Sequence, residues 1–391
     1  MQELKRIINY KRIILLLIAV TVNVVFFLYD NKPVMDEDII NKENVAHETY
    51  IKNYHEEVNA IIDNADKLKK YSIFNKAGSF SYANILQTAR DFERVKNVIL
   101  PEDEYKGVQA YTTYYYQYFF TMLVMMFVIY DMFAQRDNGM WSITYSCANG
   151  RIMYAIKQTG VIVVTGAFTH TLIYWSTFIA AMLQRGGVRD LVNPVQTIET
   201  FDKFTYPWSK IKYVTVLYLI SMVCIVALCI TIWGVFVMFR NRVYALVTML
   251  IFAAVEQFIY SHIDIHSVWN GLHYINIINI ININATFSSY RNWGVGTYVF
   301  PVFSVVLFVH IICAGVIGYI AINVSASMKP YKNTTFIKRF TDCVSAGCQK
   351  ILARIPFLFK EIHKFIFTSH CGWVVVVMLT VTAYVLSLIH I

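Results

Sequence analysis

The chain has 391 residues, of which 57% are hydrophobic and only 15% carry a charge, and its formal net charge is +9. A typical soluble domain is about 25% charged, so this composition excludes an ordinary soluble enzyme, a disordered chain and a secreted disulfide scaffold. The sequence predicts an all-α membrane protein that crosses the bilayer several times.

The predicted spans follow from the lengths of the apolar runs. A hydrocarbon core about 30 Å thick is crossed by roughly 20 apolar residues in a helix. The runs do not alternate with polar residues, and every backbone polar group in the membrane needs a partner within its own segment. We therefore expect a bundle of six transmembrane helices rather than a β-barrel. The spans are predicted at 13–29, 113–133, 158–183, 213–238, 244–261 and 297–322, with a seventh at 373–391.

Lysine and arginine residues next to the spans indicate the orientation. Most of them, including Arg6, Arg12, Arg242 and the basic segment after 329, lie on the side of the N-terminus. The positive-inside rule therefore predicts a multi-pass protein of the cell membrane with a cytoplasmic N-terminus. Anionic membrane lipids are the partners that account for the positive charge, because no dense Lys/Arg stripe indicates a nucleic acid.

These spans divide the chain into five predicted parts. Glu361–Ile366 precedes the last span much as Glu3–Ile8 precedes the first, so we expect a truncated second copy to begin there. The parts are the basic N-terminus with the first span (1–29), an extracellular helical domain (30–112), five further spans (113–322), a cytoplasmic, basic, amphipathic segment lying in the membrane interface (323–372), and the seventh span (373–391).

The predicted extracellular domain shows helical periodicity. Two apolar stripes with a spacing of three or four residues are separated by turn signals at 76–79. We expect two helices packed as an antiparallel hairpin, with Pro101 ending the second, and the tyrosines at 111–118 in the outer membrane interface. The domain is either a spacer or a surface that contacts a substrate or partner. The stripes are Ile51, Tyr54, Val58, Ile61, Ala65 and Leu68, and then Ile85, Ala89, Phe92, Val95 and Ile99.

The predicted inner loop at 134–157 contains two turn signals, Asn138-Gly139 and Asn149-Gly150, about one short helix apart. A short helix under the membrane, bracketed by turns, has a shape on which a cytoplasmic partner can push. The alternative is a simple connector whose basic residues anchor it to the inner leaflet.

Catalytic motifs are absent from the sequence. It has no Gly-Lys dipeptide, and therefore no Walker phosphate loop, and it has no GxSxG, HExxH or GxGxxG. We therefore expect no ATP hydrolysis in this chain, no cofactor and no catalytic residue. The most enzyme-like segment contains His262, Asp264 and His266, with Glu256 before it and His273 after it. Histidine, aspartate and glutamate side chains can bind zinc or manganese. The alternative interpretation is that these are ordinary polar residues of a loop.

Glu256 is the most informative polar residue inside a predicted span. A carboxylate there costs about 2.5–3.5 kcal/mol on insertion scales. We therefore expect it to face the bundle, a water-filled cavity or a dimer interface, or to be protonated. Asn23, His170 and His310 are milder cases of the same kind.

The layout resembles ABC transporter permeases of the export superfamily called ABC type 2. The likeness lies in the basic N-terminal segment, the single large domain between the first two spans, the inner loop and the six spans. The segment Asn193-Pro194-Val195-Gln196 and the restart at Glu361 resemble bacterial, Firmicutes-type members built from two fused copies.

This resemblance implies transport without catalysis by this chain. The inner loop would act as a coupling helix against an ATP-binding cassette ATPase subunit, and a second permease half or a homodimer would complete the path. The substrates of such permeases include peptides, antibiotics, lipids and polysaccharides. A membrane sensor or scaffold, or a membrane-embedded metal-dependent enzyme, is the competing prediction. The residues implied to contact the ATPase are Arg136, Gly139, Asn149, Gly150, Arg151 and Lys157.

Overall fold

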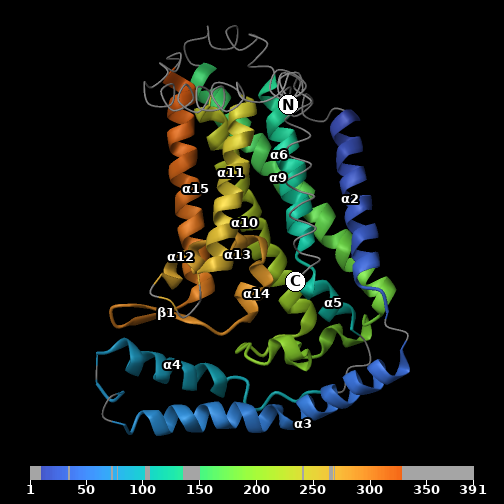
Figure 1. Cartoon of the computed structure of the whole chain (residues 1–391), viewed down its shortest axis with the longest axis vertical. Helices are drawn as coiled ribbons and strands as arrows, with labels where there is room; N and C mark the ends of the chain where they lie inside the picture. Colours follow the sequence, from blue (N-terminus) through green and yellow to red (C-terminus); the bar gives the residue numbers. More distant parts are fainter. Residues whose placement is uncertain are drawn as a thin grey trace, which may run out of the picture. The chain divides into compact units, whose positions relative to one another are not determined.

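The computed structural model describes residues 10–33, 36–71, 74–76, 78–101, 106–134, 150–239, 242–263, 267 and 269–327. This part of the chain is mainly helical, and five of its helices are long and apolar enough to cross a membrane. Together with the shorter apolar helix α6 they form one bundle (Figure 1). The prediction of an all-α, multi-pass membrane protein is confirmed. The six helices are α2 (Tyr10–Asp30), α6 (Tyr116–Met132), α9 (Gly150–Arg185), α10 (Lys210–Met238), α11 (Arg242–His262) and α15 (Val302–Ser327).

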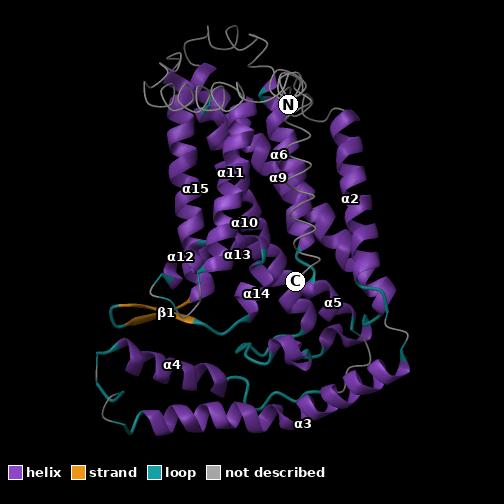
Figure 2. Ribbon diagram, in the orientation of Figure 1, coloured by secondary structure: helices purple, strands orange, loops and turns teal. Residues whose placement is uncertain are grey.

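Two predicted span starts differ from the structure by five residues or more. The span predicted from 297 begins at Val302, because a β-hairpin precedes it (Figure 2). Its strands β1 (Asn292–Val295) and β2 (Tyr298–Pro301) are antiparallel and pair Trp293 with Phe300. The span predicted from 158 begins eight residues earlier, at Gly150. The predicted tail lies outside the described residues except for 323–327, which continue α15, and so does the whole predicted seventh span.

The two amphipathic helices predicted between the first two spans are present as α3 (Glu37–Leu68) and α4 (Phe80–Glu93). They lie across one end of the bundle (Figure 1), and we call them the layer. Asp36 and Ser79 cap their first turns by accepting hydrogen bonds from the backbone nitrogens of Asp38 and Tyr82. Their shared core consists of Tyr54, Val58, Ile62, Phe92, Val95 and Leu100.

The second apolar stripe is only partly helical. Because α4 ends at Glu93, Val95 reaches the layer core from a series of turns, in which its backbone nitrogen donates to Phe92 O at 3.1 Å. Ile99, which was predicted to lie on the buried stripe, is exposed. In the first stripe Ile62 is buried, whereas the predicted Leu68 is exposed. The periodicity therefore identifies the helices but misplaces their ends.

The layer is bonded to two loops of the bundle. The α4 side chains Asp91 and Asn84 contact the segment that leads into the hairpin: Tyr290 Oη donates to Asp91 Oδ2 at 2.9 Å, and Asn292 Nδ2 donates to Asn84 Oδ1 at 2.9 Å. Burial raises the pKa of Tyr290 to about 12, so its hydroxyl stays protonated and remains a donor. From α3, the Tyr50 hydroxyl donates to the backbone oxygen of Gln196 at 2.8 Å.

Short helices make up the remaining connections at the layer end. Helix α9 ends where Gly186 and Gly187 adopt positive φ angles of 70° and 104°, a conformation that residues with a Cβ rarely adopt. The short elements are α5 (Gly107–Thr113), η1 (Arg189–Val192), η2 (Val195–Thr197), η3 (Glu199–Phe201), α12 (Asn270–Ile275), α13 (Ile278–Ile281) and α14 (Ile283–Ser288).

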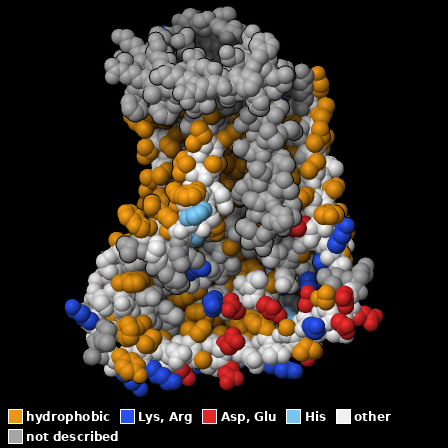
Figure 3. All heavy atoms as spheres, in the orientation of Figure 1, with side chains coloured by type: hydrophobic (Ala, Val, Ile, Leu, Met, Phe, Trp, Pro, Cys, Tyr) orange, Lys and Arg blue, Asp and Glu red, His pale blue; other side chains and the backbone are white. Residues whose placement is uncertain are grey.

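The bundle and the layer also differ in the side chains that they expose. Hydrophobic side chains cover the visible flanks of the bundle, whereas acidic and basic side chains gather on the layer (Figure 3). Exposed apolar residues such as Phe168 on α9, Phe258 on α11 and Phe308 on α15 are expected where helices face lipid. This distribution agrees with a bundle inside the membrane and a layer outside it.

Candidate functional site

The residues predicted to contact an ATPase lie around the connection between α6 and α9. Arg136, Gly139 and Asn149 lie outside the described residues. Gly150, Arg151 and Lys157 belong to the first turns of α9, so the prediction that the loop extends to 157 is wrong. No proline interrupts this part of the sequence, and Ala155 is already buried against the bundle, which explains why the helix begins so early. Lys157 is exposed.

The end of α6 is tied to two other helices. Asp131 forms an ion pair with Arg12 of α2, in which Arg12 Nε donates to Asp131 Oδ2 at 3.1 Å. The guanidinium of Arg242, the first residue of α11, lies 4.5 Å from the ring centre of Tyr130. A cation over an aromatic face is attracted by the ring quadrupole. The last turn of α6 is therefore attached to both α2 and α11.

Apolar packing joins the same turn to α9 and α10. Phe133, just after α6, lies with its ring centre 5.6 Å from that of Phe236 on α10. Trp233 and Ala155 are completely buried in the same cluster. The end of α6 and the start of α9 thus belong to one packed group of side chains. We call this group the stem cluster: Arg12, Tyr130, Asp131, Phe133, Ala155, Trp233, Phe236 and Arg242.

We expect Asp131→Asn to weaken the attachment of α2. The Arg12 side chain is only 15% exposed, whereas that of Asp131 is 61% exposed, so the ion pair is partly screened and should contribute about 0.5–1 kcal/mol. A double-mutant cycle with Arg12→Gln, read by thermal unfolding in detergent, measures this coupling. The pair Lys52–Glu48 on α3, with both side chains more than half exposed, is the matched control. Equal coupling energies in the two cycles would contradict the prediction.

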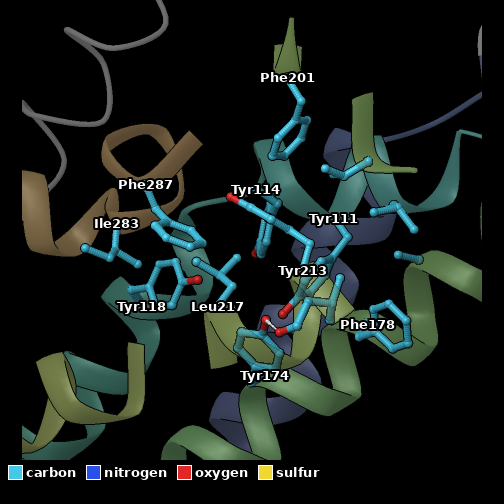
Figure 4. Close-up of a cluster of buried hydrophobic side chains, with 14 of the residues drawn as sticks. Tyr111, Tyr114, Tyr118, Tyr174, Phe178, Phe201, Tyr213, Leu217, Ile283 and Phe287 are labelled. Atoms are coloured by element: carbon cyan, nitrogen blue, oxygen red, sulfur yellow. Dashed lines mark hydrogen bonds between the residues drawn. The ribbon is translucent and has the colours of Figure 1, made fainter. Parts of the chain in front are cut away.

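A second group of polar side chains lies inside the bundle at its layer end. Tyr111, Tyr114, Tyr118, Tyr174 and Tyr213 are buried together with phenylalanines of the neighbouring elements (Figure 4). Three of the tyrosines at 111–118 are thus buried among protein side chains, and their position in the membrane interface stays a prediction. Two tyrosines of this group donate to acceptors inside the bundle: Tyr174 Oη donates to Val214 O, and Tyr213 Oη donates to Asn284 Oδ1, both at 2.7 Å.

Two of the polar residues noted inside spans hold this region together. Asn23 of α2 is fully buried, donates from Nδ2 to Thr177 Oγ1 at 2.7 Å and accepts from Tyr114 Oη at 3.0 Å. It thereby links α2 to α9 and to the start of α6. Because hydrogen bonds between helices compensate the burial of polar groups, this arrangement explains an asparagine in a span.

His170 of α9 is buried between the rings of Tyr118 and Tyr218, each with its centre 5.9 Å away. Its Nε2 lies 2.8 Å from Ser221 Oγ, a distance suited to a nucleophile and its base. However, His170 Nδ1 has no hydrogen-bond partner among the described residues, so no carboxylate orients the ring. The geometry is that of a helix contact between α9 and α10 and not of a catalytic triad.

Glu256 lies near the end of α11 and supports the turn between α12 and α13. Its Oε2 accepts a hydrogen bond from the backbone nitrogen of Ile277 at 3.0 Å, and its backbone oxygen accepts from Asn276 Nδ2 at 2.7 Å. Of the surroundings expected for Glu256, which were the bundle, a water-filled cavity or a dimer interface, these bonds agree with the first, and its protonation stays untested. They give its carboxylate a structural role.

The alternative metal site lacks support within the described chain. No group of three or more His, Cys, Asp or Glu side chains is placed there to hold a metal ion. His262 is exposed and its Nδ1 lies 3.0 Å from Phe258 O, while His273 stacks on Tyr260 with ring centres 4.6 Å apart. Asp264 and His266 lie outside the described residues.

The fold and the buried polar groups define a multi-pass, all-α membrane protein. Comparison with models of protein families, with curated proteins and with solved structures finds no match to this chain. Its function is therefore inferred from the arrangement of its own residues.

Proposed function

We propose that this chain is the permease subunit of an ATP-driven exporter of the ABC type 2 kind, which moves a substrate across the cytoplasmic membrane while a separate subunit hydrolyses ATP. The N-terminus and the connection at 135–149 lie on the cytoplasmic side in this proposal, and the layer is the extracellular domain. A second permease half, or a second copy of this chain, completes the path.

The stem cluster is the observation that supports this proposal. An ATPase at the cytoplasmic face can drive transport only if its movement reaches the spans. The end of α6 and the start of α9, which flank residues 135–149, are bonded or packed against α2, α10 and α11. A displacement of this connection would therefore move most of the bundle and not a single helix. Packed cores transmit such displacements because their side chains are close-packed.

The attachment of the layer to two loops supports a second candidate, a membrane sensor or scaffold. A ligand on α3 or α4 would act on the α9–α10 connection through Tyr50 and on α15 through Tyr290 and Asn292. The two proposals differ in one respect that can be measured: only the exporter requires a nucleotide-binding partner.

We expect the chain, isolated from its native membrane in mild detergent, to retain an ATP-binding cassette subunit that mass spectrometry identifies. Lys157→Glu and Arg151→Glu should reduce the amount of this subunit and the ATPase activity of the complex, because both positions adjoin the proposed contact. Lys52→Glu on α3 is the matched charge reversal in the layer and should change neither.

Absence of an ATP-binding subunit from the intact complex would contradict the exporter and favour the sensor. A loss of ATPase subunit that is equal for Lys157→Glu and Lys52→Glu would also contradict the proposal, because it would place the contact elsewhere or indicate general instability.

A further inference from the structure

The β1–β2 hairpin has two chemically different faces. Side chains of a strand alternate between faces, so the pairing of Asn292 with Pro301 and of Gly294 with Val299 places these four residues on one side. That side contacts α4: Asn292 donates to Asn84, and a Cβ at Gly294 would lie only 2.3 Å from the Phe80 ring. The layer therefore packs on this face at Asn292 and Gly294.

The opposite face is entirely apolar or aromatic. It consists of Trp293, Val295, Tyr298 and Phe300, and the last three are 60%, 71% and 43% exposed. Trp293 lies against Gly271 of α12, which connects this face to a second exposed group, Trp269 and Leu272. We call these six residues the aromatic face. None of them carries a charge.

The position of the hairpin relates the aromatic face to the membrane. Strand β2 ends at Pro301 and α15 begins at Val302, so the hairpin stands directly at the end of an apolar span. Figure 2 shows it projecting sideways from the bundle between α12 and α4. The chain thus passes directly from the hairpin into α15, which exposes Phe308 and Ile312 farther along the helix.

We propose that the aromatic face is a lipid-binding surface that seats the hairpin in the interfacial region of the bilayer beside α15. Tryptophan and tyrosine favour this region because their apolar rings can enter the acyl boundary while their polar atoms stay hydrated. The face that packs on the layer then fixes α4 to the membrane through the hairpin. This inference requires only that the chain spans a membrane and is independent of the proposed export.

Lipid fits this face better than a second copy of the chain or another protein. A stable protein interface has a polar rim around its apolar centre, whereas the aromatic face contains no charged residue and belongs to a hairpin that leads directly into the apolar span α15. Its alternating aromatic pattern also matches the residues by which peripheral elements rest on a bilayer. The experiment below separates these occupants.

The test uses the full chain in liposomes with an environment-sensitive fluorescent amino acid in place of Tyr298. The same fluorophore in place of Lys52, an exposed residue of α3, is the control. Two quenchers are applied, phospholipids brominated on their acyl chains and iodide in the water. We expect brominated lipid to remove most of the fluorescence at 298 and iodide to remove little, with the reverse result at 52.

Strong quenching by iodide at 298 would overturn the proposal, because the face would lie in water. Protection from both quenchers would also overturn it, because a second copy or another protein would then cover the face. The same fluorophore in place of Val295 provides an independent reporter on this face. The result at 298 is used only if the labelled variant elutes from size-exclusion chromatography at the same volume as the parent protein.

Discussion

Replacing Gly107 with alanine is expected to destabilise the protein strongly. Gly107 begins α5 and is buried against the end of α9, where a Cβ would lie 2.2 Å from the backbone oxygen of Gly186 and 2.7 Å from Met182 Cε. A backbone oxygen cannot rotate away as a side chain can, so α5 must shift. Overpacking of this kind costs about 1–3 kcal/mol or more, which unfolding by denaturant in detergent would measure.

Gly160→Ala is the matched control for this prediction. Gly160 lies within α9, and nothing stands within 4 Å of a Cβ built there. Since alanine is a better helix former than glycine by about 1 kcal/mol, this variant should be as stable as the parent or slightly more so. If Gly107→Ala and Gly160→Ala unfold alike, the close approach of α5 to the end of α9 is not present in solution.

Gly234→Ala should separate α10 from α15. A Cβ at Gly234 would lie 2.4 Å from Ile317 Cγ2, and one at Gly318 would lie 3.0 Å from Ile230 Cγ2, so each helix inserts an isoleucine beside a glycine of the other. Small residues at such contacts let helices approach closely in a membrane. Isoleucine has few allowed rotamers, so Ile317 cannot easily turn away from the added methyl group. We therefore expect the free energy of unfolding to fall by about 1–3 kcal/mol.

The control and the rescue use the same pair of helices. Gly315→Ala alters another position of α15, where a Cβ meets nothing within 4 Å, and should leave the stability unchanged. Ile317→Ala should remove most of the penalty of Gly234→Ala. In protein that already carries Ile317→Ala, adding Gly234→Ala should lower the free energy of unfolding only slightly. A penalty that persists without the isoleucine side chain would refute the proposed contact.

Much of this fold could be predicted from hydropathy alone. Apolar length identified the long helices because a membrane span needs no distant partner to be recognised. The stripes around Tyr54 and Phe92 similarly predicted the two helices of the layer. Boundaries were less accurate: the start of α15 was missed because Asn292–Pro301 is apolar enough to continue a span, yet it pairs as a hairpin.

The stem cluster could not be predicted from the sequence. The contact between Arg12 and Asp131 joins residues 119 positions apart, and Arg12 was interpreted only as a basic residue that indicates orientation. The buried tyrosines were missed for a related reason. Tyrosine is typical of the membrane interface, and the acceptors that Val214, Asn284 and Asn23 offer to buried tyrosines come from distant parts of the chain. Of the residues that the resemblance implied, three lie at the described start of α9, and their contact with an ATPase stays a prediction.

The length of α9 has a mechanical consequence. Its 36 residues extend about 54 Å, nearly twice the thickness of the hydrocarbon core, about 30 Å. The helix is thus longer than the hydrocarbon core is thick. At its far end Arg185 donates to the backbone oxygens of Asn31 and Lys32, at 3.0 and 2.8 Å, just where the chain leaves α2 for the layer. A tilt imposed near Gly150 on one side of the membrane would therefore swing the exit of α2 on the other.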